Sequence, residues 1–218
     1  MESMPVLLLS GAGLPVWIWD DVRRALPVES RVAAYPRGRS TLADHGRATL
    51  DMVADWPSLH VVAHSVGGVV AAAMAALAPD RVTAVTGVCA VVPRGGSSFV
   101  ASLPTPQRQV MGAMVRLLGT RPPERVLRSG LCRGLDDAVA DRVVADFAPE
   151  SRRLYLDRVG RHSWPGTTAY VATTADPEFP VALQERYAAT LGAQPVTIDS
   201  GHLPMLERPA ALAELLSQ

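Results

Sequence analysis

The chain has 218 residues, of which 48% are hydrophobic and 19% charged, and its 21 basic residues balance 21 acidic ones. This length suits one domain with a large core, and the composition excludes a disordered chain. No apolar run reaches the ~18 residues of a membrane span, and no basic segment opens the chain, so we expect a cytoplasmic protein without membrane contact.

All basic residues are arginines, and their distribution along the chain is uneven. Residues 94–165 carry 12 arginines and 7 acidic residues, a net charge of +5. Because these arginines form no contiguous run and do not alternate with aromatic residues, we expect no nucleic-acid binding. The two cysteines, Cys89 inside an apolar run and Cys132, fit packing positions, and the five histidines lack paired ligand spacing. We therefore expect no disulfide, no metal site and no cofactor.

The first apolar run, residues 5–10 (PVLLLS), predicts a parallel strand that is buried on both faces, because it does not alternate with polar residues. It ends at the glycine turn 11–13, and a helix is expected to follow as far as about Pro27. Residues 31–35 (RVAAY) predict a second strand, and residues 41–54 have helical spacing.

The next segment, LHVVAHSVGGVVAAAM at residues 59–74, predicts a buried strand, a tight turn and a buried helix, with Ser65 at the apex of the turn. A strand that reverses into a helix so sharply crowds the backbone, and the small residues Ala63 and Gly67 meet that requirement. The turn directs the Ser65 hydroxyl outward and points the backbone N–H of Val66 at the same space. The simpler alternative is that Ser65 only starts the helix.

After a strand predicted at 81–92, the pattern becomes helical throughout residues 94–165. We expect this segment to form a small helical cap, inserted into a core made of residues 1–93 and 166–218. Two apolar stripes run along the cap helices, and we expect most of these residues to serve packing, although some of them could line a pocket. The stripes are Val110, Met111, Met114, Leu117 and Leu118, and Ala138, Val139, Val143, Val144 and Phe147.

Strand patterns return at residues 168–174 and 195–199, separated by a helix at about 181–191. Strands that alternate with helices in this way predict an α/β fold, with a mainly parallel sheet of about six strands and helices on both faces. Asp176 follows the first of these strands. The segment GHLPMLERP, which begins at Gly201, follows the second and leads into a closing helix.

Three motifs resemble those of the α/β-hydrolase fold superfamily. AHSVGG around Ser65 is similar to the G-x-S-x-G nucleophile elbow, with Ala63 in place of the first glycine. GHLPMLERP is similar to the catalytic-histidine loop of the family. SGAGL resembles the H-G-A-G turn of plant-esterase-like and hydroxynitrile-lyase-like members, with Ser10 where histidine is usual. With its arginine-rich, lysine-free composition, the chain resembles a bacterial member of this group.

The resemblance implies a catalytic triad, whose residues occur in the order Ser, Asp, His that this fold requires. Ser65 would be the nucleophile, His202 the general base and then acid, and Asp176 the carboxylate that orients the histidine. The backbone N–H groups of Ala12 and Val66 would form the oxyanion hole.

Other residues compete for some of these roles. Asp199 is the rival for the carboxylate, although it lies very close to the histidine in sequence, and Glu178 is a lesser rival in the same loop as Asp176. His64, next to the nucleophile, is interpreted as a buried polar packing residue.

The leading hypothesis is a serine hydrolase that cleaves a carboxylic ester or thioester through an acyl-serine intermediate. An acyltransferase is the alternative, because an acidic acyl carrier protein would be attracted to the basic cap, although we favour an ordinary solvated helical face as the explanation of that charge. Hydroxynitrile lyases of this group carry a lysine near the site, and the chain has none. A non-catalytic ligand-binding protein on the same fold is the alternative from another class.

Overall fold

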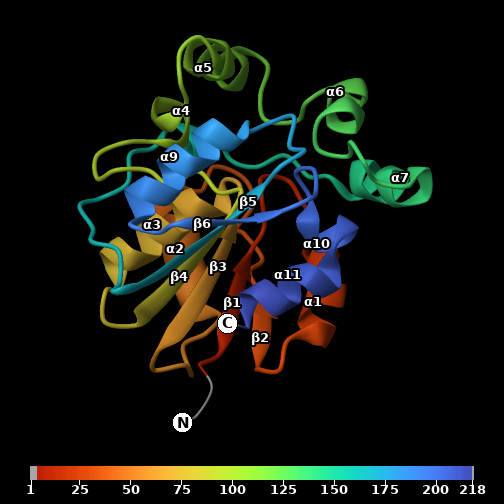
Figure 1. Cartoon of the computed structure of the whole chain (residues 1–218). Helices are drawn as coiled ribbons and strands as arrows, with labels where there is room; N and C mark the ends of the chain where they lie inside the picture. Colours follow the sequence, from red (N-terminus) through yellow and green to blue (C-terminus); the bar gives the residue numbers. More distant parts are fainter. Residues whose placement is uncertain (1–3, 218) are drawn as a thin grey trace.

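The structure is a computed structural model that describes residues 4–217. Six strands form one parallel sheet in the order β2-β1-β3-β4-β5-β6 (Figure 1). This architecture confirms the α/β prediction of a parallel sheet with about six strands. The strands are β1 Val6–Leu9, β2 Ser30–Val32, β3 Leu59–His64, β4 Val82–Val88, β5 Thr167–Thr173 and β6 Pro195–Ile198.

The central strands are buried on both faces of the sheet. In β1, Leu7 and Leu9 belong to one hydrophobic cluster, whereas Val6 and Leu8 belong to a second cluster on the opposite face. Successive side chains of a strand point to opposite faces. A strand covered on both sides must therefore be apolar throughout, which explains the continuous apolar run in the sequence.

Helices cover both faces of the sheet, as the alternating sequence pattern predicts (Figure 1). The first helix of one face, α2, begins at a capping box in which the Thr41 hydroxyl and the Asp44 carboxylate each accept a backbone N–H of the other residue. That face carries α2 Leu42–Asp51, α3 Gly67–Leu77 and α9 Val181–Leu191. The other carries the 3₁₀ helix η1 Val16–Trp19, α1 Asp20–Ala25, α10 Pro204–Glu207 and α11 Pro209–Leu216.

Four predicted strands are shorter in the structure, and the difference is largest at the second and fourth strands. β2 is confined to Ser30–Val32, and β4 ends at Val88 rather than at residue 92. Cys89 therefore lies beyond β4 and not inside a strand, at a left-handed φ of 35°. The chain then turns behind Ser65, and the N–H of Val91 donates a 3.0 Å hydrogen bond to the carbonyl oxygen of Ser65. Residues 89–92 are buried against the Ser65 turn, which explains why this part of the sequence is apolar although it is not a strand.

The segment between β4 and β5 forms five short helices, α4 to α8. The helices α4 to α7 lie beyond the carboxyl-terminal ends of the parallel strands (Figure 1). Ligand sites of α/β sheets are found at this end. None of the helices in the described part of the chain is long and apolar enough to cross a membrane. The five helices are α4 Phe99–Ser102, α5 Gln107–Leu117, α6 Glu124–Ser129, α7 Asp137–Asp146 and α8 Arg152–Leu156.

Candidate active site

Ser65 occupies the turn between β3 and α3 and has a left-handed backbone conformation, with φ of 54°. A non-glycine residue in this region is strained and is held there by its surroundings. Two glycines allow the close approach that the turn needs. A Cβ atom at Gly67 would lie 2.9 Å from the carbonyl oxygen of Leu9, and one at Gly68 would collide with the carbonyl oxygen of Val91.

Two backbone N–H groups beside this turn are free to bind a ligand. Among residues 4–217, the N–H groups of Ala12 and Val66 donate to no protein acceptor. Ala12 lines the same cavity as Ser65. Unpaired N–H groups at a cavity wall and at the start of a helix favour a negatively charged oxygen.

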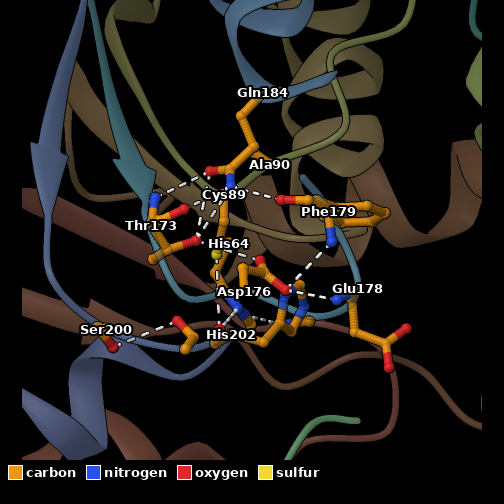
Figure 2. A network of polar contacts seen from close by, with 12 residues as sticks. His64, Cys89, Ala90, Thr173, Asp176, Glu178, Phe179, Gln184, Ser200 and His202 are labelled. Atoms are coloured by element: carbon orange, nitrogen blue, oxygen red, sulfur yellow. Dashed lines mark hydrogen bonds and ion pairs between the residues drawn. The ribbon is translucent and has the colours of Figure 1, made fainter. Parts of the chain in front are cut away.

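His202 and Asp176 form a buried pair (Figure 2), with 2.7 Å between His202 Nδ1 and Asp176 Oδ2. Asp176 follows β5 and His202 follows β6, so the parallel sheet places both residues at one edge. The other carboxylate oxygen, Oδ1, accepts the backbone N–H groups of Glu178 at 2.7 Å and Phe179 at 3.1 Å. These bonds fix the orientation of the carboxylate toward the imidazole.

The histidine loop is shaped by its own motif. Gly201 donates its backbone N–H to the carboxylate of Glu207 at 3.0 Å, and a Cβ atom at Gly201 would lie 2.9 Å from the carbonyl oxygen of Arg133. The glycine and the glutamate of the motif therefore hold the loop that presents His202.

Ser65 and His202 line one cavity. No hydrogen bond joins their side chains within the described residues. In apo structures such bonds are often long and become shorter when the substrate binds. The structure therefore brings together the serine, the histidine and the carboxylate identified in the sequence, with the His202–Asp176 contact already formed.

Opposing effects act on the pKa of His202. Burial alone lowers it, but the hydrogen bond and the charge of the Asp176 carboxylate raise it, and the pKa lies above the ordinary 6.5. Burial raises the pKa of the nearby Cys89 thiol, so this thiol is uncharged at neutral pH. We therefore attribute the raised pKa of His202 to the Asp176 carboxylate and not to Cys89. Burial also raises the pKa of Asp176, but the hydrogen bond and charge of His202, together with the backbone N–H groups of Phe179 and Glu178, outweigh burial and keep that pKa below its usual range.

His64 connects the parts of the site, a role that its interpretation as a packing residue missed. Its Nδ1 accepts the backbone N–H of Gly11 at 3.1 Å, and its Nε2 donates to the carbonyl oxygen of His202 at 2.8 Å. Burial lowers the pKa of His64 to about 3, so the ring is neutral, as this pattern of one acceptor and one donor requires. Its place beside Ser65 in the elbow was the only sequence signal for this role.

The loop that carries Ala12 is further held at Ser10, the residue that replaces the usual histidine. The Ser10 hydroxyl accepts the indole N–H of Trp19 at 3.1 Å, and the Tyr35 hydroxyl donates to the Ser10 carbonyl oxygen at 2.9 Å. The loop is therefore braced by different partners without a histidine at position 10.

Replacing His64 with alanine is expected to lower kcat about 10- to 100-fold, because small displacements of reacting groups cost this much. It is also expected to destabilise the fold by about 2–4 kcal/mol, because a buried ring and its two hydrogen bonds are lost. Steady-state kinetics and urea unfolding measure the two effects. His60→Ala, on the same strand, is the matched control, since the His60 ring bonds Thr86 and no group of the site. Equal kcat values in the two variants would contradict the role of His64.

The rival carboxylates have other surroundings. Asp199 is exposed and accepts a hydrogen bond from the Thr174 hydroxyl at 3.2 Å. Glu178 contacts Asp176 through its backbone N–H only, and its carboxylate points away from Asp176 and His202 (Figure 2). Neither carboxylate orients His202 in this structure.

The cavity has a volume of about 500 Å³ and extends from Ser65 beneath the cap helices. Part of the first cap stripe lines it rather than packing in the core, and Leu117 and Leu118 are 77% and 80% exposed. Val143, Val144 and Phe147 of the second stripe are buried, as expected for packing. The largely apolar lining comes from Leu14, Phe99, Leu103, Met111, Met114, Val115, Leu118, Val126, Leu127, Leu131, Phe147 and Phe179.

One group of side chains has the composition of a metal site. Ligand atoms of His64, Cys89 and His202 lie within 4.8 Å of one another. Both nitrogens of His64 and the Nδ1 of His202 are already engaged in hydrogen bonds. A metal ion would have to displace these partners, so the cluster is better suited to holding the loops together than to binding a metal.

A family model described as the alpha/beta hydrolase family matches residues 6–215. The chain belongs to this family. No curated protein sequence matches this alpha/beta hydrolase.

Solved structures share its fold over almost the whole chain. An extracellular alpha/beta-hydrolase from a Paenibacillus species, described as sharing structural and functional homology with tobacco salicylic acid binding protein 2, has a TM-score of 0.85 at 18% identity, with 98% of each chain covered. Polyneuridine aldehyde esterase has a TM-score of 0.77 at 15% identity, again with 98% of each chain covered. A thermophilic esterase from Thermogutta terrifontis has a TM-score of 0.71 at 22% identity, covering 98% of this chain and 88% of its own. These likenesses establish the fold.

Proposed function

We propose that this alpha/beta hydrolase is a serine esterase or thioesterase that acts through an acyl-serine intermediate. Ser65 is the nucleophile, His202 the general base and acid, and Asp176 the orienting carboxylate. The observation that carries the proposal is the 2.7 Å contact between His202 and Asp176 in a loop that shares one cavity with Ser65.

The proposed reaction has two halves. Ser65 Oγ attacks the carbonyl carbon while its proton passes to His202 Nε2, and the N–H groups of Ala12 and Val66 stabilise the oxyanion. Collapse of this intermediate breaks the bond to the alcohol or thiol, which leaves with the proton from His202. Water then attacks the acyl-serine by the same route and releases the acid.

Acyl transfer from a carrier-protein thioester is the competing function, and it depends on the positive charge of residues 94–165. Three of the twelve arginines in this segment are paired within it: Arg128 with Glu124 and Asp141, Arg142 with Asp146, and Arg153 with Asp157. These pairs favour a solvated helical face over a carrier-docking surface.

The experiment that separates the two functions compares nitrophenyl esters with an acyl-carrier thioester of the same acyl chain. We expect ester turnover with no preference for the carrier. Transfer of the acyl group from the carrier thioester to an added acceptor, faster than its release as the free acid, would contradict the hydrolase proposal and favour acyl transfer.

The pKa of His202 determines the expected pH dependence. The imidazole must be neutral to accept the serine proton, so activity rises as the pH passes through this pKa. Because Asp176 raises the pKa of His202, we expect kcat/KM to rise with a midpoint above pH 6.5. A pH profile of ester hydrolysis measures this midpoint, and a rate independent of pH between 5 and 8 would contradict the assignment.

A further inference from the structure

The polar side chains of the cavity wall, other than Ser65 and His202, differ in how far their hydrogen-bonding capacity is used. The Thr120 hydroxyl donates to the carbonyl oxygen of Glu150 at 2.6 Å. The Arg121 guanidinium donates to the carbonyl oxygens of Phe147 and Val144. These carbonyl oxygens fix the Thr120 hydroxyl and part of the Arg121 guanidinium, which keeps its positive charge in the cavity wall.

Three further polar residues line the cavity: Gln107, Tyr155 and Glu178. Gln107 is exposed at the start of α5. Burial raises the pKa of Tyr155, so its hydroxyl stays neutral. Glu178 is therefore the one cavity-lining group, among the described residues, that can carry a negative charge near neutral pH.

The Glu178 carboxylate has no protein partner. Within residues 4–217 it takes part in no hydrogen bond or ion pair, and it lies against Gly130 at the end of α6, where any side chain would collide with it. Figure 2 shows it directed away from the Asp176–His202 pair. Glu178 is half-buried, and this partial burial raises its pKa, as expected for a carboxyl group that has lost part of its water without gaining a partner.

An unpaired carboxylate beside apolar walls discriminates between ligands by charge. A ligand ammonium group restores the interactions that burial removed, whereas a ligand carboxylate is repelled. The remaining wall, which includes Met111, Met114 and Leu131, offers apolar contact to a hydrocarbon. A molecule with an apolar body and one cationic end matches both parts of the cavity.

We propose that Glu178 is a specificity-determining residue that selects esters or thioesters carrying an ammonium group on an otherwise apolar body. The reaction named here rests on the proposed function. The binding preference does not, because it requires only the cavity and the carboxylate.

The test measures binding of hexylammonium, 1-hexanol and hexanoate by calorimetry near neutral pH. We expect the wild-type protein to bind hexylammonium about 10-fold or more tightly than hexanol, and hexanoate most weakly. In Glu178→Gln this preference should fall to about threefold or less. Glu185→Gln is the matched control, because Glu185 is exposed on α9 outside the cavity, and it should retain the preference.

Equal affinity of the wild-type protein for hexylammonium and hexanol would overturn the proposal, and this comparison needs no variant. A preference that survives in Glu178→Gln would overturn it as well. If no ester is hydrolysed but the Glu178-dependent preference is present, the hydrolase proposal fails and the specificity proposal stands. If esters are hydrolysed but the preference is absent, the specificity proposal fails and the hydrolase proposal stands.

Discussion

Replacing Ser65 with alanine is expected to lower kcat for nitrophenyl ester hydrolysis by about 10⁴-fold or more, because the acyl intermediate of the proposed reaction forms on the Ser65 hydroxyl. Residual activity would come from the two oxyanion donors and from substrate binding. The variant should fold, since alanine removes only a hydroxyl that makes no protein hydrogen bond within the described residues. Steady-state and burst kinetics measure the loss.

Ser58→Ala is the matched control for this loss. Ser58 precedes β3 at the opposite edge of the sheet, so its hydroxyl lies far from the cavity. We expect this variant to keep the wild-type kcat. A Ser65→Ala protein that retained more than about a tenth of the activity would contradict the role of Ser65.

Replacing Asp176 with asparagine is expected to lower kcat by about 10³- to 10⁴-fold. An amide N–H facing His202 Nδ1 would favour the wrong imidazole tautomer and would no longer stabilise the imidazolium. The midpoint of the pH profile should also fall, since the charge that raises the pKa of His202 is gone. The same kinetic assay at several pH values measures both effects.

Asp199→Asn separates the two candidate carboxylates. Because Asp199 bonds Thr174 and not His202, we expect its loss to change kcat less than about threefold. The reverse order of effects, with Asp199→Asn inactive and Asp176→Asn active, would show that the carboxylate was assigned to the wrong residue.

The parts of the fold and site that the sequence predicted are those with local causes. Continuous apolar runs predicted strands that are buried on both faces, and the small residues around Ser65 predicted a sharp strand-to-helix turn. The edge shared by Ser65, Asp176 and His202 follows from parallel strands that each end just before one of these residues. None of these inferences needs a contact between residues that are far apart in sequence.

The braces around the site were not predictable, because each depends on a partner far along the chain. His64 bonds Gly11 and His202, which lie 53 and 138 residues away. Trp19 and Tyr35 support Ser10 from two further elements. A sequence pattern reports which residue types are present, but it does not report which of them meet after folding.

The cap helix α5 shows a second feature that an apolar sequence pattern does not predict, namely what the apolar face of a helix contacts. Val110, Met111, Met114, Leu117 and Leu118 share a helical stripe, and such a stripe usually faces a core. Here α5 forms part of a cavity wall, so part of the stripe lines the cavity and Leu117 faces solvent. Apolar periodicity predicted the helix correctly, but it did not distinguish a helix that faces a core from one that lines a cavity.

Reaction with a fluorophosphonate probe, followed by peptide mass spectrometry, tests most directly whether His202 and Asp176 activate Ser65 as a nucleophile. A serine hydroxyl reacts with the probe only when a neighbouring base activates it. We expect one phosphonate adduct per chain, on the peptide that contains Ser65, formed at a rate that falls sharply in Asp176→Asn. Absence of labelling in the folded protein, or an adduct at another serine, would contradict the assignment of Ser65 as an activated nucleophile.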